Sequence, residues 1–189
     1  HESVPDGLTE GDNAEIRKWG KKVEFNFKPK NHMELGDSLQ LFDFKKAAKL
    51  SGSGFPLYTG KGAELERKLI NSMIDFHVKN YNYKELFPPV LMLKDSMITT
   101  GQLPKFQEDM YHTEVDNLFL APTAEVPVTN IHRDDILEES ELPKYYVAYS
   151  PCFRRESGSY GKDTRGLLRV HQFNKVELVF CFYGLVYSV

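Results

Sequence analysis

The sequence predicts an α+β fold in which helices pack on an antiparallel β-sheet. Helical and strand-like segments are interleaved along the 189 residues. The last two strand-like segments, 145–153 and 168–180, follow one another with only a loop between them, which is the order of a hairpin. A hydrophobic content of 41% is sufficient for one domain with an ordinary core.

The first half of the chain is expected to be mostly helical. Residues 1–29 are predicted to form an extended arm, and a short helix is predicted over 43–50 with Asp43 as its N-cap. A longer helix is predicted over 63–81, because its apolar residues approximate helical spacing: Leu65, Leu69, Met73, Phe76 and Val78. Pro88 and Pro89 should prevent its continuation.

The second half is expected to contain most of the strands. The pattern predicts a strand over 90–93, a short helix over 95–100 and a strand pair over 110–121. A helix is then expected over 123–133, with Thr123 as its N-cap. The strands 145–153 and 168–180 would complete the sheet.

The loop between these last strands reverses the charge of the chain. Residues 144–175 contain seven basic and two acidic side chains, a net charge of +5, whereas the whole chain carries −3. Such a local excess of positive charge indicates a site for a polyanion such as ATP or RNA. A solvated charged hairpin without a ligand has the same composition, and this alternative stays open.

Alternation along the two strands suggests how such a site would be built. Arg154 and Glu156 would share one face, where the arginine can clamp a phosphate. The return strand would place five side chains on one face, and an aromatic ring between cations can stack on a purine: Arg169, His171, Phe173, Lys175 and Glu177. Chance alternation on a charged hairpin gives a similar pattern.

Other site classes find little support. Gly60 and Lys61 fail as a P-loop, because the preceding glycine and the following Ser or Thr are absent. Cys152 and Cys181 are too few for a disulfide scaffold, so reduced thiols in the cytoplasm are expected. The histidines His77, His112, His132 and His171 lack metal-ligand spacing and are interpreted as structural or exposed. The longest uncharged run, 178–189, is too short to span a membrane.

Several motifs carry a resemblance to a known family. The segment FRRESGSYGKDTRGLLRVHQFNKVELV resembles motif 2 of the class II aminoacyl-tRNA synthetases, in the version typical of their serine-specific members. GAELERKL through Pro89 resembles motif 1, and TTGQLPKFQEDMYH followed by APTAEVPVTN agrees in order. The similarity extends over residues 1–179 and implies the class II catalytic core.

The resemblance implies a role for each matching residue. Arg154 would be the catalytic residue that bridges the substrate carboxylate and the α-phosphate. Serine would be bound by Thr123, Ala124, Glu125, Arg154 and Glu177. ATP would be bound by Arg154, Arg155, Glu156, Arg169 and Phe173, and the tRNA acceptor end by Ser157, Gly158, Lys162 and Arg165.

The implied activity is ATP-dependent formation of seryl-adenylate and transfer of serine to tRNA(Ser). A homodimer through the helix 63–81 and the Pro89 region is implied, as is a cytoplasmic location. ATP would be a substrate and Mg²⁺ a cofactor, whose ligands are expected outside this chain because no metal site is recognised within it.

Some parts of the family pattern are not found. The N-terminal tRNA-binding arm and motif 3 have no counterpart, and residues 180–189 form an atypical apolar tail. We therefore expect a partial core that is inactive alone. Two alternatives remain: a synthetase paralogue that loads an amino acid onto a carrier protein, and a noncatalytic dimerisation or binding module.

Overall fold

A computed structural model describes residues 7–156, 165–182 and 185–188, the last four through their backbone only. The chain divides into two compact units, His1–Lys30 and Asn31–Val189. In the first unit, η1 (Glu10–Asp12) is held by the Asp12 carboxylate, which accepts the backbone amides of Thr9 and Leu8. These bonds lower the pKa of Asp12. Residues 13–30 form neither helix nor strand, as predicted for an extended arm.

Two short helices open the second unit. In α1 (His32–Leu39), the Asn31 side chain accepts the Glu34 amide at 2.9 Å, and the Glu34 carboxylate accepts the Asn31 amide at 2.9 Å. The next helix, α2 (Phe44–Ser51), follows Asp43 as predicted, and Asp43 Oδ1 accepts the Lys46 amide at 2.8 Å. Helix α1 was not predicted, although an Asn followed three residues later by Glu is a helix-start signal.

The main sheet has the strand order β1-β5-β6-β7. Its strands are β1 (Lys84–Leu86), β5 (Lys144–Phe153), β6 (Gln172–Phe182) and β7 (Leu185–Ser188). All neighbours are antiparallel except β1, which runs parallel to β5 because residues 87–143 return the chain to the same end of the sheet. The predicted antiparallel sheet is therefore confirmed apart from this parallel edge.

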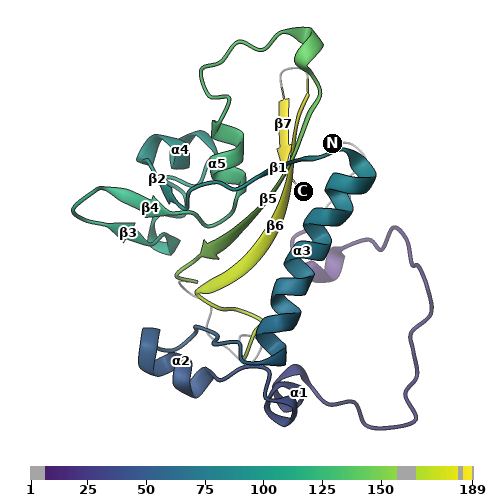
Figure 1. The fold of residues 1–189 in the computed structure, drawn as a ribbon. Helices are drawn as coiled ribbons and strands as arrows, with labels where there is room; N and C mark the ends of the chain where they lie inside the picture. The colour runs from purple at the N-terminus through teal and green to yellow at the C-terminus, as the bar shows by residue number, and fades with distance from the viewer. Residues whose placement is uncertain (1–6, 157–164, 183–184, 189) are drawn as a thin grey trace. The chain divides into compact units, whose positions relative to one another are not determined.

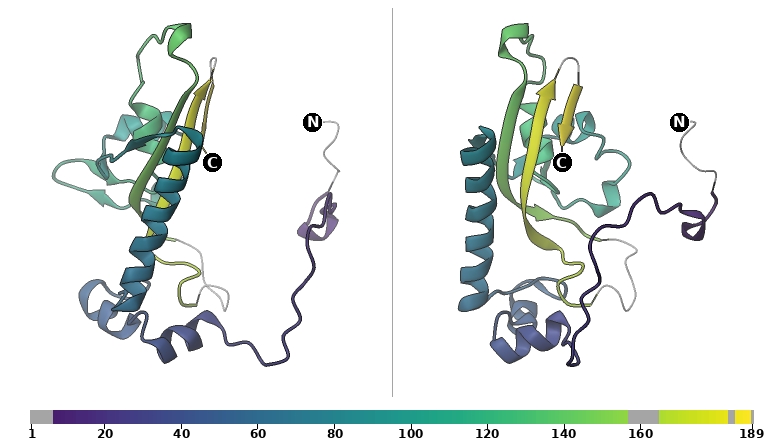
Figure 2. Two further views of the ribbon diagram at one scale, coloured as in Figure 1. Left: turned by 45° about the vertical axis from the view of Figure 1, so that its right-hand side comes forward. Right: turned by 90° about the vertical axis from the view of Figure 1, so that its right-hand side faces the viewer.

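Different elements cover the two faces of this sheet. The long helix α3 (Lys61–Tyr81) packs against β5 and β6 on one face, and the segment containing α4 (Lys94–Thr99) and α5 (Glu125–Asn130) covers the other (Figures 1 and 2). Ala124 and Val128 pack there against Tyr146, Ala148 and other residues of β5 and β6. No helix in the described ranges is long and apolar enough to cross a bilayer.

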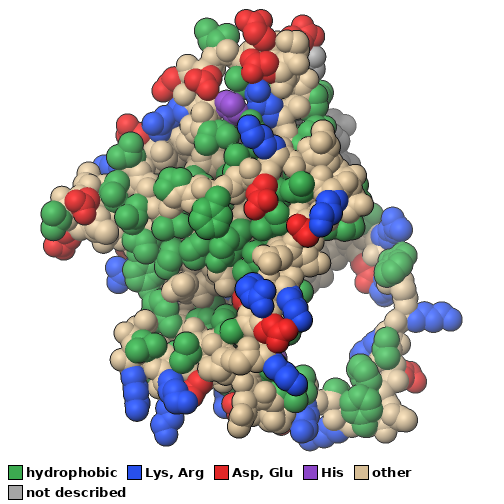
Figure 3. Space-filling model, viewed as in Figure 1, with side chains coloured by type: hydrophobic (Ala, Val, Ile, Leu, Met, Phe, Trp, Pro, Cys, Tyr) green, Lys and Arg blue, Asp and Glu red, His purple; other side chains and the backbone are tan. Residues whose placement is uncertain are grey.

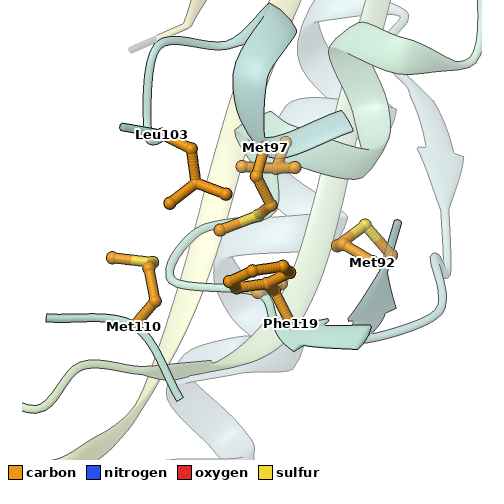
Figure 4. Packing of buried hydrophobic residues seen from close by; sticks show 7 residues of the cluster. Met92, Met97, Leu103, Met110 and Phe119 are labelled. Atoms are coloured by element: carbon orange, nitrogen blue, oxygen red, sulfur yellow. The ribbon is translucent and has the colours of Figure 1, made fainter. Parts of the chain in front are cut away.

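A smaller sheet of order β2-β4-β3 forms a second layer. Its strands are β2 (Leu91–Met92), β3 (His112–Thr113) and β4 (Leu118–Leu120), accompanied by α4 (Lys94–Thr99), η2 (Gln107–Asp109), α5 (Glu125–Asn130) and η3 (Glu139–Glu141). Core side chains of this layer point toward one another in Figure 4: Met92, Met97, Leu103, Met110 and Phe119. Three of these side chains are methionines. Thioether side chains fill irregular gaps of this kind well.

Two sequence expectations are wrong near the cationic loop. β5 ends at Phe153 and β6 begins at Gln172, so Arg154, Arg169 and His171 lie outside the strands. Glu156 has a φ of 52°, which takes it off the extended path on which it would share a face with Arg154. A third correction concerns another part of the chain: the helix predicted over 123–133 is the shorter α5, and Ala124 rather than Thr123 is its N-cap.

Candidate functional site

A cavity of about 370 Å³ gathers several of the predicted site residues. Four segments line it: residues 102–110, which include η2; residues 122–125, which lead into α5; the residues after β5; and β6 with the residues before it. The lining side chains are Gln102, Phe106, Asp109, Met110, Pro122, Thr123, Glu125, Arg154, Glu156, Arg169 and Lys175. Basic and acidic side chains are equally represented among them, so the cavity is not simply cationic.

A buried polar cluster closes the inner end of this cavity. Lys175 and Glu177 lie two residues apart on β6 and therefore share one face of the strand. Glu177 is only 2% exposed; its Oε2 accepts a hydrogen bond of 2.7 Å from Thr123 Oγ1 and forms an ion pair with Lys175 Nζ. Lys175 Nζ also donates to Thr123 Oγ1 at 3.2 Å. The buried carboxylate is thus fixed by two partners, as an interior charge requires.

Arg154 enters the cavity directly after β5. Its Nε donates to the Pro122 carbonyl oxygen at 3.4 Å, and its guanidinium carbon lies 5.2 Å from the centre of the Phe173 ring. This distance is within the range of a cation–π contact. One face of the Phe173 ring is therefore already covered by the Arg154 guanidinium. The hydrogen bond to the Pro122 carbonyl oxygen fixes the direction of this side chain.

Arg169 and Glu156 meet at the outer side of the cavity. Arg169 Nη1 donates to Glu156 Oε2 at 2.8 Å, but the Arg169 side chain is 55% exposed. The Glu156 side chain is only 17% exposed. The guanidinium is therefore the open side of this pair and is accessible to an anion that enters the cavity.

The other predicted site residues lie around or outside the cavity. Ala124 is buried behind Thr123, and Glu177 and Phe173 contact lining residues without lining the cavity themselves. The Arg155 amide donates to the Asp109 carbonyl oxygen at 2.8 Å, but its side chain is not part of the lining.

The residues expected to contact tRNA are only partly placed. Arg165 lines a separate cavity beside α1. Ser157, Gly158 and Lys162 lie outside the described residues.

This arrangement was compared with known proteins. A family model described as the tRNA synthetase class II core domain (G, H, P, S and T) matches residues 106–187. A seryl-tRNA synthetase from Pyrococcus horikoshii, solved in complex with ATP, superposes with a TM-score of 0.87 at 36% identity, over 95% of this chain and 44% of that one. The chain has the fold of a class II tRNA synthetase core. A second structure, a cytoplasmic serine-tRNA ligase from Naegleria fowleri in complex with AMP, matches the chain with a TM-score of 0.84 at 32% identity, over 95% of this chain and 43% of that one.

Curated relatives show a closer likeness in sequence. The chain is 59% identical to a serine–tRNA ligase of Geobacillus sp. (strain WCH70) over 179 residues, which are 95% of this chain and 42% of the relative. It is 58% identical to the corresponding ligase of Geotalea uraniireducens over 94% of this chain and 42% of that relative. The chain thus spans about two fifths of the length of the relatives it matches.

Lys175 is the main residue of the cavity that sequence reasoning missed. It was noted in the alternating pattern but given no role, although the spacing of Lys175 and Glu177 on one strand face was the signal for a pair. Met110 and Phe106 were also missed, because only tertiary packing brings residues 102–110 to the cavity.

Two further kinds of chemistry to consider are a reactive cysteine and a metal site. Cys152 is fully buried, and burial raises the pKa of its thiol, with a smaller opposing effect from Ser150. This environment suits the small core residue that was predicted rather than a nucleophile. Within the described ranges, no group of three or more His, Cys, Asp or Glu side chains is placed to hold a metal ion.

Proposed function

We propose that this cavity binds ATP and serine, forms seryl-adenylate and serves the transfer of serine to tRNA(Ser). The observation that carries the proposal is the convergence of Thr123, Arg154 and Arg169 on one cavity in this fold. The likeness to a seryl-tRNA synthetase solved with ATP supports it.

The proposed chemistry needs no protein nucleophile. A carboxylate oxygen of serine attacks the α-phosphorus of ATP, the new oxygen–phosphorus bond forms, and the bond to the leaving pyrophosphate breaks. Negative charge grows on the α-phosphoryl oxygens, where the Arg154 guanidinium would neutralise it. Preorganised donors of this kind typically contribute on the order of 3 kcal/mol, or about 10² in rate. Arg169 would leave Glu156 and bind the γ-phosphate.

Serine recognition would use the acidic inner part of the cavity. Glu125 lines it and offers a carboxylate for the serine ammonium group. Glu177 acts here through Thr123 and Lys175, whose positions it fixes. Polar groups arranged for a hydroxyl reject alanine strongly, because alanine leaves them unpaired. Among the described residues, no group of three or more His, Cys, Asp or Glu side chains is placed to hold Mg²⁺.

Binding to the 189-residue chain tests the proposal without requiring turnover. Isothermal titration should detect ATP and, more tightly, a sulfamoyl analogue of seryl-adenylate. Arg154→Ala should weaken analogue binding by about 10²-fold, because it removes the charge facing the phosphoryl position. Arg133→Ala is the matched control, since Arg133 bonds to Ser96 and Asn130 and does not line the cavity. Equal affinities of the wild type and Arg154→Ala would contradict the proposal.

We also infer that α3 forms the centre of a homodimer interface. The helix exposes a stripe of large apolar side chains at helical spacing, each between 44% and 51% exposed: Leu65, Leu69, Met73 and Phe76. Next to its C-terminal end, Phe87 is 81% exposed, and Pro88 and Pro89 line an apolar cavity of about 330 Å³. Hydrophobic side chains also gather between the small sheet and α3 (Figure 3). Contiguous apolar surface of this kind is typical of protein–protein contacts.

The dimer is tested by sedimentation velocity. Leu69→Asp should shift the chain from dimer to monomer, because it places a charge in the centre of the stripe. Val115→Asp is the matched control, since Val115 is 94% exposed on the β3–β4 turn. A monomeric wild type, or a Leu69→Asp variant that sediments as the wild type does, would refute this interface.

A further inference from the structure

His171 connects the residues after β5 and the residues before β6 to the loop between α2 and α3. Its carbonyl oxygen accepts the Arg154 amide at 2.9 Å, and its own amide donates to the Gly54 carbonyl oxygen at 2.8 Å. The side chain adds a third bond, with Nδ1 lying 3.1 Å from the Arg154 carbonyl oxygen. His171 is therefore bonded both to Arg154, which enters the cavity, and to the loop between α2 and α3.

The imidazole ring is held in one orientation and one tautomer. A carbonyl oxygen only accepts hydrogen bonds, so Nδ1 must carry the proton. The Phe55 ring lies 5.2 Å from the imidazole centre and the Tyr111 ring 6.3 Å from it. On the side of Nε2 the ring meets Gly54, where an added Cβ would lie only 2.6 Å from Cδ2. The backbone of this loop therefore fits closely against the ring.

We propose that His171 is a positioning residue for ATP in this site. Through Nδ1 it holds the Arg154 carbonyl and thereby sets the direction in which the Arg154 side chain enters the cavity; this inference rests on the proposed ATP-binding function. A purely structural histidine would need only a ring of the right size. A positioning role requires a hydrogen-bond donor at the Nδ1 position.

Two amide substitutions separate these roles. In His171→Asn the side-chain nitrogen can occupy the Nδ1 position, whereas in His171→Gln it reaches toward the Nε2 position. His171→Phe keeps the ring and removes both nitrogens. Titration with ATP should give His171→Asn an affinity within about twofold of the wild type. His171→Gln and His171→Phe should bind about tenfold more weakly, the effect of one lost hydrogen bond. His112→Phe, on the β3–β4 hairpin, is the control and should bind as the wild type does.

A second measurement does not depend on ATP. Hydrogen–deuterium exchange of a peptide covering 150–156 should be faster in His171→Gln and His171→Phe than in the wild type and His171→Asn, because the hairpin end opens. If the wild type binds no ATP, the proposed function fails, and the exchange data still decide whether His171 holds Arg154. Wild-type affinity and exchange in His171→Gln and His171→Phe would overturn the inference. Equal losses in all three variants, His171→Asn included, would also overturn it.

Gly54 offers an independent route to the same bridge. Gly54→Ala should weaken ATP binding about as much as His171→Phe, because the new methyl group displaces the imidazole. Gly54 also has a φ of 80°, so alanine strains the backbone in either background. In a His171→Ala background only this strain remains, and the further loss of ATP affinity should be smaller than the loss that Gly54→Ala causes in the wild type. Additive losses of affinity in the double variant would contradict the bridge.

Discussion

Replacing Lys175 by methionine removes the cation that faces the buried carboxylate of Glu177. Breaking a buried ion pair from one side costs roughly 3–5 kcal/mol, because an uncompensated charge stays in the interior. The Lys175 side chain is 34% exposed and Thr123 remains as a hydrogen-bond donor, so the lower end applies. We expect Lys175→Met to lower the free energy of unfolding by about 3 kcal/mol, which corresponds to about 6–12 °C in Tm for a chain of this size.

Urea unfolding followed by circular dichroism measures this change. The double variant Lys175→Met/Glu177→Gln should be more stable than Lys175→Met alone, because the glutamine removes the unpaired charge and keeps an acceptor for Thr123. Lys79→Met is the control: its ion pair with Asp75 is exposed, and no measurable change is expected. A Lys175→Met variant as stable as the control would refute the reasoning that Glu177 is charged and dependent on Lys175.

Three other substitutions test the packing around the site, each by urea unfolding. Gly62→Ala should cost about 3 kcal/mol, because the new Cβ collides with the Leu41 carbonyl oxygen; a change below about 1 kcal/mol would contradict this packing. Tyr149→Phe should cost about 1 kcal/mol by removing the hydroxyl that donates to Asn174 Oδ1 at 2.9 Å, and no loss would show that the bond is absent. Burial raises the pKa of the Cys152 thiol, so its contribution to stability is complete below the ordinary value of 9.0 and declines as pH rises above it. The wild type should therefore lose more stability than Cys152→Ala between neutral pH and about pH 11. Equal losses of stability in the two proteins would refute a raised pKa of the Cys152 thiol.

Local sequence signals were sufficient for most elements of the fold. The Asp43 cap, the apolar periodicity of α3 and the hairpin order of β5 and β6 all appear as predicted, because neighbouring residues determine them. The periodicity could not show that Leu65 and Leu69 face away from the sheet, since an apolar stripe looks the same whether it faces the chain's own core or another surface. The parallel pairing of β1 with β5 depends on contacts between distant segments and has no local signal.

The candidate site was predictable in membership but not in geometry. Motif resemblance named Thr123, Arg154 and Arg169, which line one cavity. Strand alternation misplaced Glu156, because a left-handed backbone conformation after β5 is not visible in the residue pattern. The hydrogen bond between Lys175 and Thr123 had no local signal, since Thr123 comes from a segment 52 residues earlier in the chain.

The alternation of β6 imposes a parity rule on its length. Lys175 and Glu177 face the cavity side, while Asn174 faces α3 and donates to Glu66 Oε1 at 3.0 Å. Inserting one residue inside β6 between Phe173 and Asn174, with the pairing of Gln172 and Phe173 to β5 kept, would exchange the faces of the residues that follow, placing amide and aliphatic side chains in the cavity and a lysine–glutamate pair against the helix. Inserting two residues there would restore the original assignment. Changes in length inside the strand are therefore tolerable only in even steps.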